Sequence, residues 1–226
     1  MHDYQREFID FLVEAEALLF GDFTTKSGRQ TPYFINTGCF RSGAQLARLG
    51  ECYARAILDH FGDEFDVLFG PAYKGIPLAV SAGVALAREH GKDCGVLFDR
   101  KEAKDHGEGG ALVGHELSDG DRVIIVEDVT TRGTSIRETL PRLQAAARVE
   151  PVGLIVAVDR GERGPSGEGT ALEELGRTFG LQTAAIVSVH DLITHLHGRQ
   201  YDGRVLLDDE GRGRMEAYLR QYAPSV

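Results

Sequence analysis

The feature that most constrains the fold is an apolar run that ends in two adjacent carboxylates and a turn rich in hydroxyl groups. Residues 123–126 are all aliphatic, which is typical of a strand buried on both faces of a parallel sheet. Glu127 and Asp128 follow directly. The next turn supplies backbone N–H groups and hydroxyls that can hold an anion at a helix N-terminus. Its residues are Val129, Thr130, Thr131, Arg132, Gly133, Thr134 and Ser135.

The two acidic side chains would repel a phosphate in direct contact. We therefore expect them to face hydroxyl groups or a metal, while the turn binds the phosphate. A phosphorylated ribose offers both groups on one ligand. The alternative is an ordinary strand-to-helix turn, because Thr and Ser are common cap residues at such junctions.

Composition excludes several classes of protein. The chain has 226 residues with 25 Lys and Arg against 35 Asp and Glu, a net charge of −10, so a general nucleic-acid surface is not expected. Three widely spaced cysteines without a CxxC pair argue against a disulfide framework or a zinc ribbon and fit a reducing, cytoplasmic location. No apolar stretch approaches the ~20 residues of a membrane span. The first twenty residues have the spacing of an amphipathic helix rather than of a signal peptide.

Strand-like and helix-like segments alternate from residue 42 onward. This order predicts an α/β fold, a central parallel sheet flanked by helices, within a single domain spanning residues 1–226. Expected strands cover residues 65–69, 94–98, 122–126, 153–158 and 183–189, and expected helices cover 42–60, 76–89, 136–147, 190–197 and 210–222. Ligands of such sheets bind outside the carboxyl ends of the strands, so these ends are where chemistry is expected.

Three further strand ends contain candidate binding groups. Gly70–Gly75 is a turn in which N–H groups can surround an oxyanion with Lys74 as counter-charge, although a plain β–α turn is the alternative. Residues 99–110 hold several cations within a long, glycine-tipped segment that suits a mobile lid over a multivalent anion. A self-paired solvated loop remains the alternative there. Arg160, after the strand ending at 158, can grip a carboxylate with two parallel hydrogen bonds, or simply pair with Asp159.

Taken together, these stretches resemble the bacterial orotate phosphoribosyltransferases, a branch of the type I phosphoribosyltransferases. The resemblance rests on segments 23–29 and 32–34, the turn after Phe69, the Arg-Lys-Glu-Ala-Lys-Asp-His-Gly-Glu-Gly-Gly segment of residues 100–110, the acidic-pair motif, and Asp159-Arg160. Glu127 stands where the family commonly has Asp, Thr130 where an aliphatic residue is frequent, and Ile35 where an aromatic residue is frequent.

The resemblance implies transfer of the phosphoribosyl group from phosphoribosyl diphosphate (PRPP) to orotate, giving orotidine 5′-phosphate and diphosphate, a step of pyrimidine nucleotide synthesis. It also implies Mg²⁺ held mainly by PRPP and water, with no dedicated protein cage. A small N-terminal hood, roughly residues 1–40, a mobile lid, roughly residues 100–112, and a homodimer that shares Arg100 and the lid between subunits are further implications.

The resemblance assigns roles by position. Glu127 and Asp128 would bind the ribose hydroxyls, and residues 131–135 would bind the 5′-phosphate. Val129 and Thr130 would also contact PRPP, and Lys101 and Lys104 would be catalytic along with the acidic pair. The diphosphate would be bound by Lys26, Tyr73, Lys74, Arg100, Lys101, Lys104 and His106. Orotate would be bound by Phe34, Ile35, Thr131 and Arg160.

Two other functions compete with this hypothesis. A phosphoribosyltransferase for a purine or for uracil would share the fold, but a neutral base gives Arg160 no carboxylate to pair with. A PRPP-sensing regulator would need a DNA-binding segment or a basic face, which this acidic chain lacks. A metal site at His195 and His197 is not expected, because residues two apart on a helix point to different faces.

Overall fold

The computed structural model describes residues 1–25, 28–104, 110–129 and 133–224, with the backbone alone for 101–104 and 110. Its centre is a six-stranded sheet in the order β5-β4-β3-β6-β7-β8. All neighbouring strands are parallel except the β4–β5 pair. The strands are β3 Val67–Gly70, β4 Gly95–Lys104, β5 Gly110–Gly114, β6 Arg122–Val126, β7 Glu150–Asp159 and β8 Gln182–Ser188.

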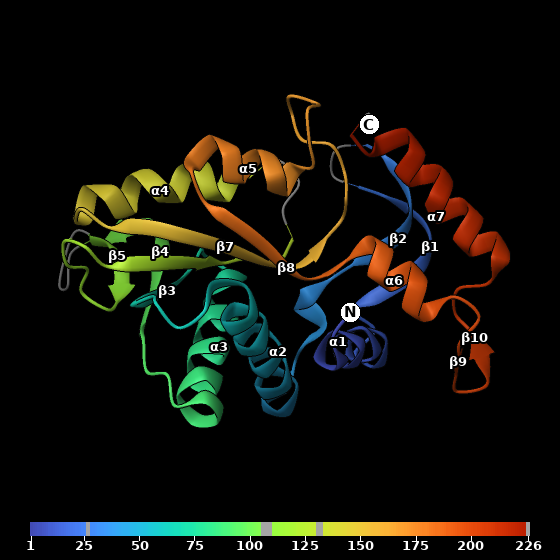
Figure 1. Cartoon of the computed structure of the whole chain (residues 1–226), viewed down its shortest axis with the longest axis horizontal. Helices are drawn as coiled ribbons and strands as arrows, with labels where there is room; N and C mark the ends of the chain where they lie inside the picture. Colours follow the sequence, from blue (N-terminus) through green and yellow to red (C-terminus); the bar gives the residue numbers. More distant parts are fainter. Residues whose placement is uncertain (26–27, 105–109, 130–132, 225–226) are drawn as a thin grey trace.

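Helices cover both faces of this sheet, which confirms the predicted fold class. Helices α2 (Gly43–Phe61) and α3 (Gly75–His90) lie below it in Figure 1, and α4 (Thr134–Ala146) and α5 (Ala171–Phe179) lie above it. Successive side chains of β6 point to opposite faces of the sheet. Ile124 packs in the cluster with α2 and α3, and Ile125 in the cluster with α4 and α5. The continuous apolar run of β6 is therefore explained by burial on both sides.

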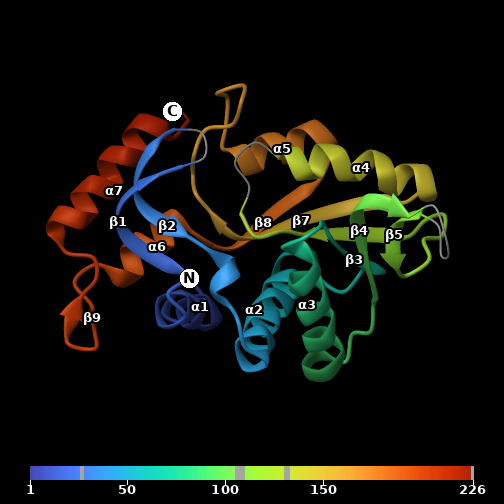
Figure 2. The ribbon, with the colours of Figure 1, turned by 180° about the vertical axis from the view of Figure 1, so that it is seen from behind.

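The first and last segments of the chain pack together at one end of the sheet, as Figures 1 and 2 both show. An antiparallel hairpin of β1 (Leu18–Thr24) and β2 (Gln30–Ile35) contacts the C-terminal helix α7 (Asp209–Tyr222). The remaining elements here are α1 (Asp3–Glu14), η1 (Thr37–Cys39), α6 (Val189–Leu196), β9 (Gln200–Tyr201) and β10 (Arg204–Val205). Within the described residues, no helix combines the length and apolarity that crossing a bilayer requires.

Some sequence-based boundaries were wrong. The helix expected over the first twenty residues ends at Glu14, and Leu18 already pairs with Ile35 in the β1–β2 hairpin. The polar segment expected as a loop after Asp99 continues β4 through Lys104 and pairs with β5, with Asp99 opposite Leu112. Because ladder hydrogen bonds join backbone groups, an edge hairpin forms without an apolar pattern. Helix α5 was not expected, although Thr170 and Glu173 form a capping box at its start.

Candidate functional site

The carboxyl ends of β3, β4 and β6 meet at one edge of the sheet because these strands are parallel neighbours. Gly70, the last residue of β3, lies opposite Phe98 of β4. The next β4 residue, Asp99, is buried and accepts hydrogen bonds from the Ala72 backbone N–H (2.6 Å) and from Arg142 (2.7 Å). Asp99 thus ties the β3–α3 turn to β4 and to α4. Sequence reasoning missed it, since its partners lie 27 and 43 residues away.

Asp128 lies at the centre of a polar contact between three segments. Its Oδ2 accepts hydrogen bonds from Lys74 Nζ (2.9 Å) and from the Thr37 hydroxyl (3.0 Å), and its Oδ1 accepts one from the Val129 backbone N–H (2.7 Å). The structure therefore brings Lys74 next to the acidic pair, as the parallel strand ends predict. It also adds Thr37, which the sequence did not suggest. A carboxylate held at both oxygens presents a fixed acceptor to a ligand hydroxyl.

Glu127 points toward the start of α4 rather than toward Lys74. Its Oε2 accepts a 2.6 Å hydrogen bond from the Ser135 hydroxyl, and its backbone carbonyl accepts one from Tyr53 (2.7 Å). Burial of the carboxyl, and next the charge of Asp128, raise the pKa of Glu127, while the Ser135 bond works against that rise. Ser135, predicted to contact the phosphate, is here a partner of Glu127.

This raised pKa has a consequence for stability that can be measured. A carboxyl whose pKa is higher in the folded state stabilises the fold below its unfolded pKa, about 4.3, and that stabilisation is lost as the pH rises through the folded value. We therefore expect Glu127→Gln to have a higher Tm than the wild type at pH 7, and this difference to shrink as the pH approaches 4. The measurement is a thermal unfolding series against pH.

Glu138→Gln is the matched control, since Glu138 lies exposed on α4, the helix that also carries Ser135. It should leave the Tm unchanged across the series. A Glu127→Gln variant no more stable than the wild type at pH 7 contradicts the idea that the buried charge is costly.

Helix α4 begins directly after a glycine whose backbone only glycine adopts readily. Gly133 has φ +63°, and a Cβ there would clash with the side chain of Leu175. Gly133 is followed directly by the first turn of α4, whose leading backbone N–H groups have no i−4 partner within the helix. Thr134 is exposed at this end and Ser135 is half-buried. Such an N-terminus favours an anion.

Arg160 is buried beyond the end of β7, in a cluster that the sequence did not predict. Its guanidinium lies over the Tyr33 ring, 4.5 Å from the centroid, and its Nε donates to Glu162 (2.7 Å). Arg160 Nη2 and the Tyr33 hydroxyl are both buried without a hydrogen-bond partner among the described residues. Asp159, the alternative partner, instead accepts from the Gly161 N–H (2.9 Å). The alternative considered from the sequence, an ion pair on the surface between Asp159 and Arg160, is therefore not formed.

The other predicted residues lie as follows. Phe34 is exposed on β2 and stacks on Phe23 with ring centroids 5.5 Å apart, and Ile35 is half-buried. Tyr73 is 67% exposed, and Arg100 is half-buried on β4. Lys101 and Lys104 belong to β4, where the structure describes their backbone only. Predicted residues that fall outside the described part of the chain are Lys26, His106, Thr130, Thr131 and Arg132.

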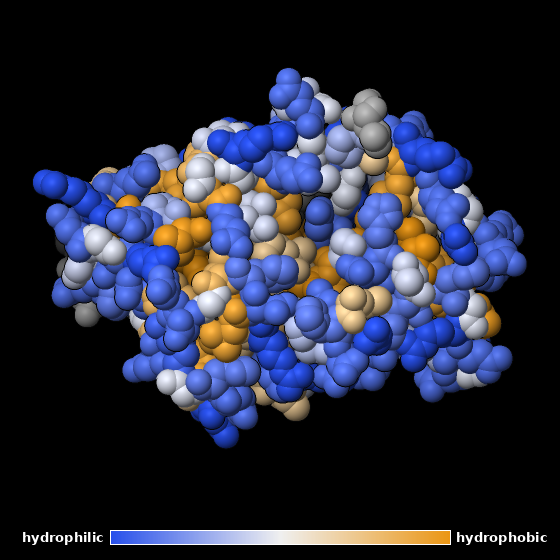
Figure 3. Space-filling model, in the orientation of Figure 1, coloured by the Kyte–Doolittle hydropathy of each residue, from blue (hydrophilic) through white to orange (hydrophobic). Residues whose placement is uncertain are grey.

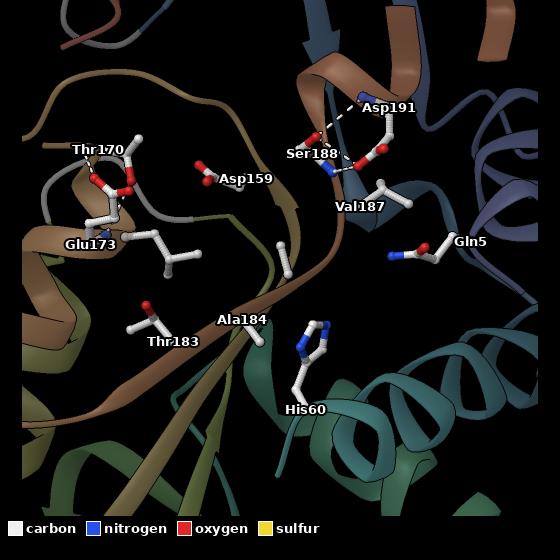
Figure 4. Close-up of a pocket in the computed structure, with 12 residues that line it drawn as sticks. Gln5, His60, Asp159, Thr170, Glu173, Thr183, Ala184, Val187, Ser188 and Asp191 are labelled. Carbon is white, nitrogen blue, oxygen red and sulfur yellow. Dashed lines mark hydrogen bonds between the residues drawn. The ribbon is translucent and has the colours of Figure 1, made fainter. Parts of the chain in front are cut away.

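A separate hollow of about 340 Å³ runs along the outer edge of β8. Figure 4 shows Asp159, Thr170 and Glu173 on one side of it and the Ser188–Asp191 helix cap on the other. On this face, apolar residues are exposed between the helices above the sheet, α4 and α5, and those below it, α2 and α3 (Figure 3). None of the predicted site residues lines this hollow. In the described chain, no group of three or more His, Cys, Asp and Glu side chains has the arrangement of a metal site.

Comparison with known proteins agrees with this geometry. A family model described as the phosphoribosyl transferase domain matches residues 41–173. The orotate phosphoribosyltransferase of Lachnoclostridium phytofermentans is 53% identical over 222 residues, which covers 98% of both chains. That of Vibrio cholerae is 54% identical over 196 residues, covering 87% of this chain and 90% of the relative.

A solved structure gives the same result. The crystal structure of the Francisella tularensis orotate phosphoribosyltransferase superposes with a TM-score of 0.81 at 31% identity, covering 96% of this chain and 99% of that one. The resemblance inferred from the acidic pair and the neighbouring strand ends is thereby confirmed. This chain belongs to the orotate phosphoribosyltransferase family.

Proposed function

We propose that this orotate phosphoribosyltransferase binds PRPP across the carboxyl ends of β3, β4 and β6 and transfers its phosphoribosyl group to orotate held beside Arg160. The observation that supports this most is the order of groups at the end of β6. A fixed carboxylate, Asp128, is followed within a few residues by Gly133 and the N-terminus of α4. Acceptors for a diol and donors for a phosphate are thus adjacent in the fold.

The ribose and its 5′-phosphate would divide between these groups. Asp128 and Glu127 would accept hydrogen bonds from the ribose hydroxyls, and residues 129–135 would surround the phosphate at the start of α4. Lys74 bonds Asp128 at 2.9 Å and lies at the N-cap of α3. When PRPP arrives, Lys74 would exchange part of this contact for the diphosphate. The acidic pair would then be left to the sugar.

The diphosphate would be bound by cations from several segments. Lys26, Tyr73, Lys74, Arg100, Lys101, Lys104 and His106 are its proposed ligands. Mg²⁺ usually retains water and binds through substrate phosphates with one or two carboxylates, and the acidic pair offers oxygen donors of that kind. Mg²⁺ bound with PRPP would neutralise part of the diphosphate charge.

Orotate would bind between β2 and the end of β7. Arg160 would grip its carboxylate, and Phe34, Ile35 and Thr131 would line the ring. The buried Arg160 Nη2 supports this role, because a buried donor without a partner is costly unless a ligand completes it.

The reaction breaks the bond between ribose C1 and the diphosphate oxygen. The orotate ring nitrogen forms the new bond to C1 and gives up its N–H proton to the departing diphosphate or to water. The electron pair of the broken bond leaves with the diphosphate, so negative charge grows there while positive charge grows on the ribose. Lysines of the lid would stabilise the negative charge on the diphosphate, and Asp128 with Glu127 would stabilise the positive charge on the ribose. Closure of the site would exclude water, strengthen these contacts and prevent hydrolysis of PRPP.

A homodimer that shares Arg100 and the lid fits the shape of β4. Phe98 lies level with the end of β3, and β4 continues to Lys104. At ~3.3 Å per residue this extension reaches roughly 20 Å past the strand ends, far enough to serve a neighbouring subunit. Val80 and Val84, one turn apart on α3, are exposed apolar side chains that a second subunit can cover. Sedimentation of the purified chain measures this assembly.

A base panel tests the proposed function. The purified chain, given PRPP and Mg²⁺, is expected to consume orotate and to leave uracil, adenine and hypoxanthine essentially unchanged, because only orotate brings a carboxylate to Arg160. Loss of orotate absorbance and release of diphosphate are the two readouts. Turnover of uracil at a rate comparable to orotate would overturn the proposed role of Arg160, and turnover of no base would overturn the proposed function.

A further inference from the structure

We infer that Glu162 is a positioning residue for orotate binding: it fixes the guanidinium of Arg160, whose buried Nη2 keeps its hydrogen-bonding capacity for the substrate carboxylate. This inference rests on the proposed role of Arg160. The carboxylate of Glu162 is buried, with 6% of the residue exposed, and it receives hydrogen bonds from three donors on three segments. These are Arg160 Nε (2.7 Å), the Tyr218 hydroxyl (2.7 Å) and Arg29 Nη1 (3.1 Å).

The three donors come from parts of the chain that are distant in sequence. Arg160 follows β7, Tyr218 is on α7, and Arg29 precedes β2 in the hairpin. In Figures 1 and 2 the connection from β7 to α5 rises beside this hairpin. Glu162 is therefore the joint at which the sheet, the hairpin and the last helix meet.

Glu162 is itself held in place by its backbone. Its carbonyl accepts from the Ala171 N–H at the start of α5 (2.9 Å), and the next N–H, of Arg163, donates to the Tyr222 carbonyl (2.7 Å). A side chain anchored in this way can orient a longer and more flexible one. Arginine has many rotamers, and fixing one of them before the ligand arrives saves the entropy of ordering it later.

The geometry of the guanidinium explains what this orientation achieves. Glu162 takes Nε, and the face of the group lies on the Tyr33 ring at 4.5 Å. An in-plane bond and a stacked face together leave a single orientation for a planar group. Nη2 has no hydrogen-bond partner within the described part of the chain, and it can therefore donate to a ligand carboxylate.

Two buried atoms indicate that a ligand belongs here. Arg160 Nη2 and the Tyr33 hydroxyl lack hydrogen-bond partners within the described part of the chain, and they belong to groups that stack on each other. A carboxylate from orotate would supply the missing acceptor.

Steady-state kinetics of Glu162→Gln test this inference. The glutamine amide keeps an oxygen that can accept from Arg160. Its N–H₂ group would then face Arg29, which is also a donor, and the negative charge is lost. We expect the KM for orotate to rise about tenfold, the effect of one charge-assisted hydrogen bond, with the KM for PRPP within about twofold of wild type. In the reverse reaction the KM for orotidine 5′-phosphate should rise and that for diphosphate should not.

Two further variants complete the design. Tyr218→Phe removes one donor to Glu162 and is expected to raise the orotate KM about two- to threefold, and it serves if Glu162→Gln does not fold. Glu168→Gln, the same change at an exposed position of the same loop, should leave both KM values unchanged.

The outcomes are distinguishable. If Arg160→Ala raises the orotate KM but neither Glu162→Gln nor Tyr218→Phe does, Glu162 has no positioning role and the proposed function stands. An equal rise in both KM values, with a lower Tm, makes Glu162 a purely structural residue and also overturns the inference. If Arg160→Ala leaves the orotate KM unchanged, the assignment of Arg160 itself fails.

Discussion

Lys104→Ala is expected to lower kcat by roughly 10²–10³-fold, because removing one preorganised donor from a site of developing charge has this effect. The negative charge on the departing diphosphate grows as the bond to ribose C1 breaks. A lysine that closes over it in a site shut from water stabilises that charge more in the transition state than in the ground state. Single-turnover rates with orotate and PRPP measure the loss directly.

The fold should survive this change, since Lys104 is the last residue of β4 and its backbone pairs, among the described residues, only with Gly110 of the edge strand β5. Lys92→Ala is the control. It removes the same charge just after the C-terminus of α3, away from the carboxyl ends of the strands, and should keep kcat near wild type. Normal turnover by Lys104→Ala would refute the lid hypothesis. A lowered Tm in parallel with the lost rate would instead indicate a structural effect.

Arg160→Ala is expected to weaken orotate binding by roughly 10–100-fold, the value of hydrogen bonds between charged groups, with PRPP binding within about threefold of wild type. The arginine is 8% exposed and its Nε donates to Glu162, so its loss would remove the proposed carboxylate site. Separate calorimetric titrations of the two ligands measure this. Equal losses for orotate and PRPP would count against the assignment.

Two comparisons refine this experiment. Arg160→Lys keeps the positive charge but loses the planar guanidinium that can form two parallel hydrogen bonds. We expect an intermediate loss of orotate affinity. Arg148→Ala removes an arginine whose side chain is 91% exposed, and should change neither affinity. Because removal of Arg160 leaves Glu162 with one partner fewer, the Tm of each variant should be recorded alongside.

The sheet and its main helices could be predicted because their signals are local. Four aliphatic residues before Glu127 imply burial on both faces, and the structure places Ile124 and Ile125 in opposite clusters. Alternation of strands and helices then implies parallel order, and parallel order brings strand ends together. Lys74 and Asp128, 54 residues apart, were expected near each other on this ground, and they form a 2.9 Å contact.

The segments that prediction missed lack such local signals. The extension of β4 past Asp99 is polar and is held by backbone pairing with β5, so its residue types do not reveal it. Helix α5 has only nine residues, and its capping box at Thr170 is a brief signal that was overlooked. Short elements are decided by what packs against them more than by their own propensity.

By itself, the sequence determined that residues 122–126 form a buried strand followed by an acidic pair, and which chemical groups come next. Only the tertiary structure decided that Thr37 joins Asp128, that Asp99 ties β3 to α4, and that Tyr33 and Glu162 orient Arg160. The reason is physical. Periodicity and composition report how one segment is buried, whereas contacts between residues tens of positions apart depend on strand register and helix packing, which no single segment encodes.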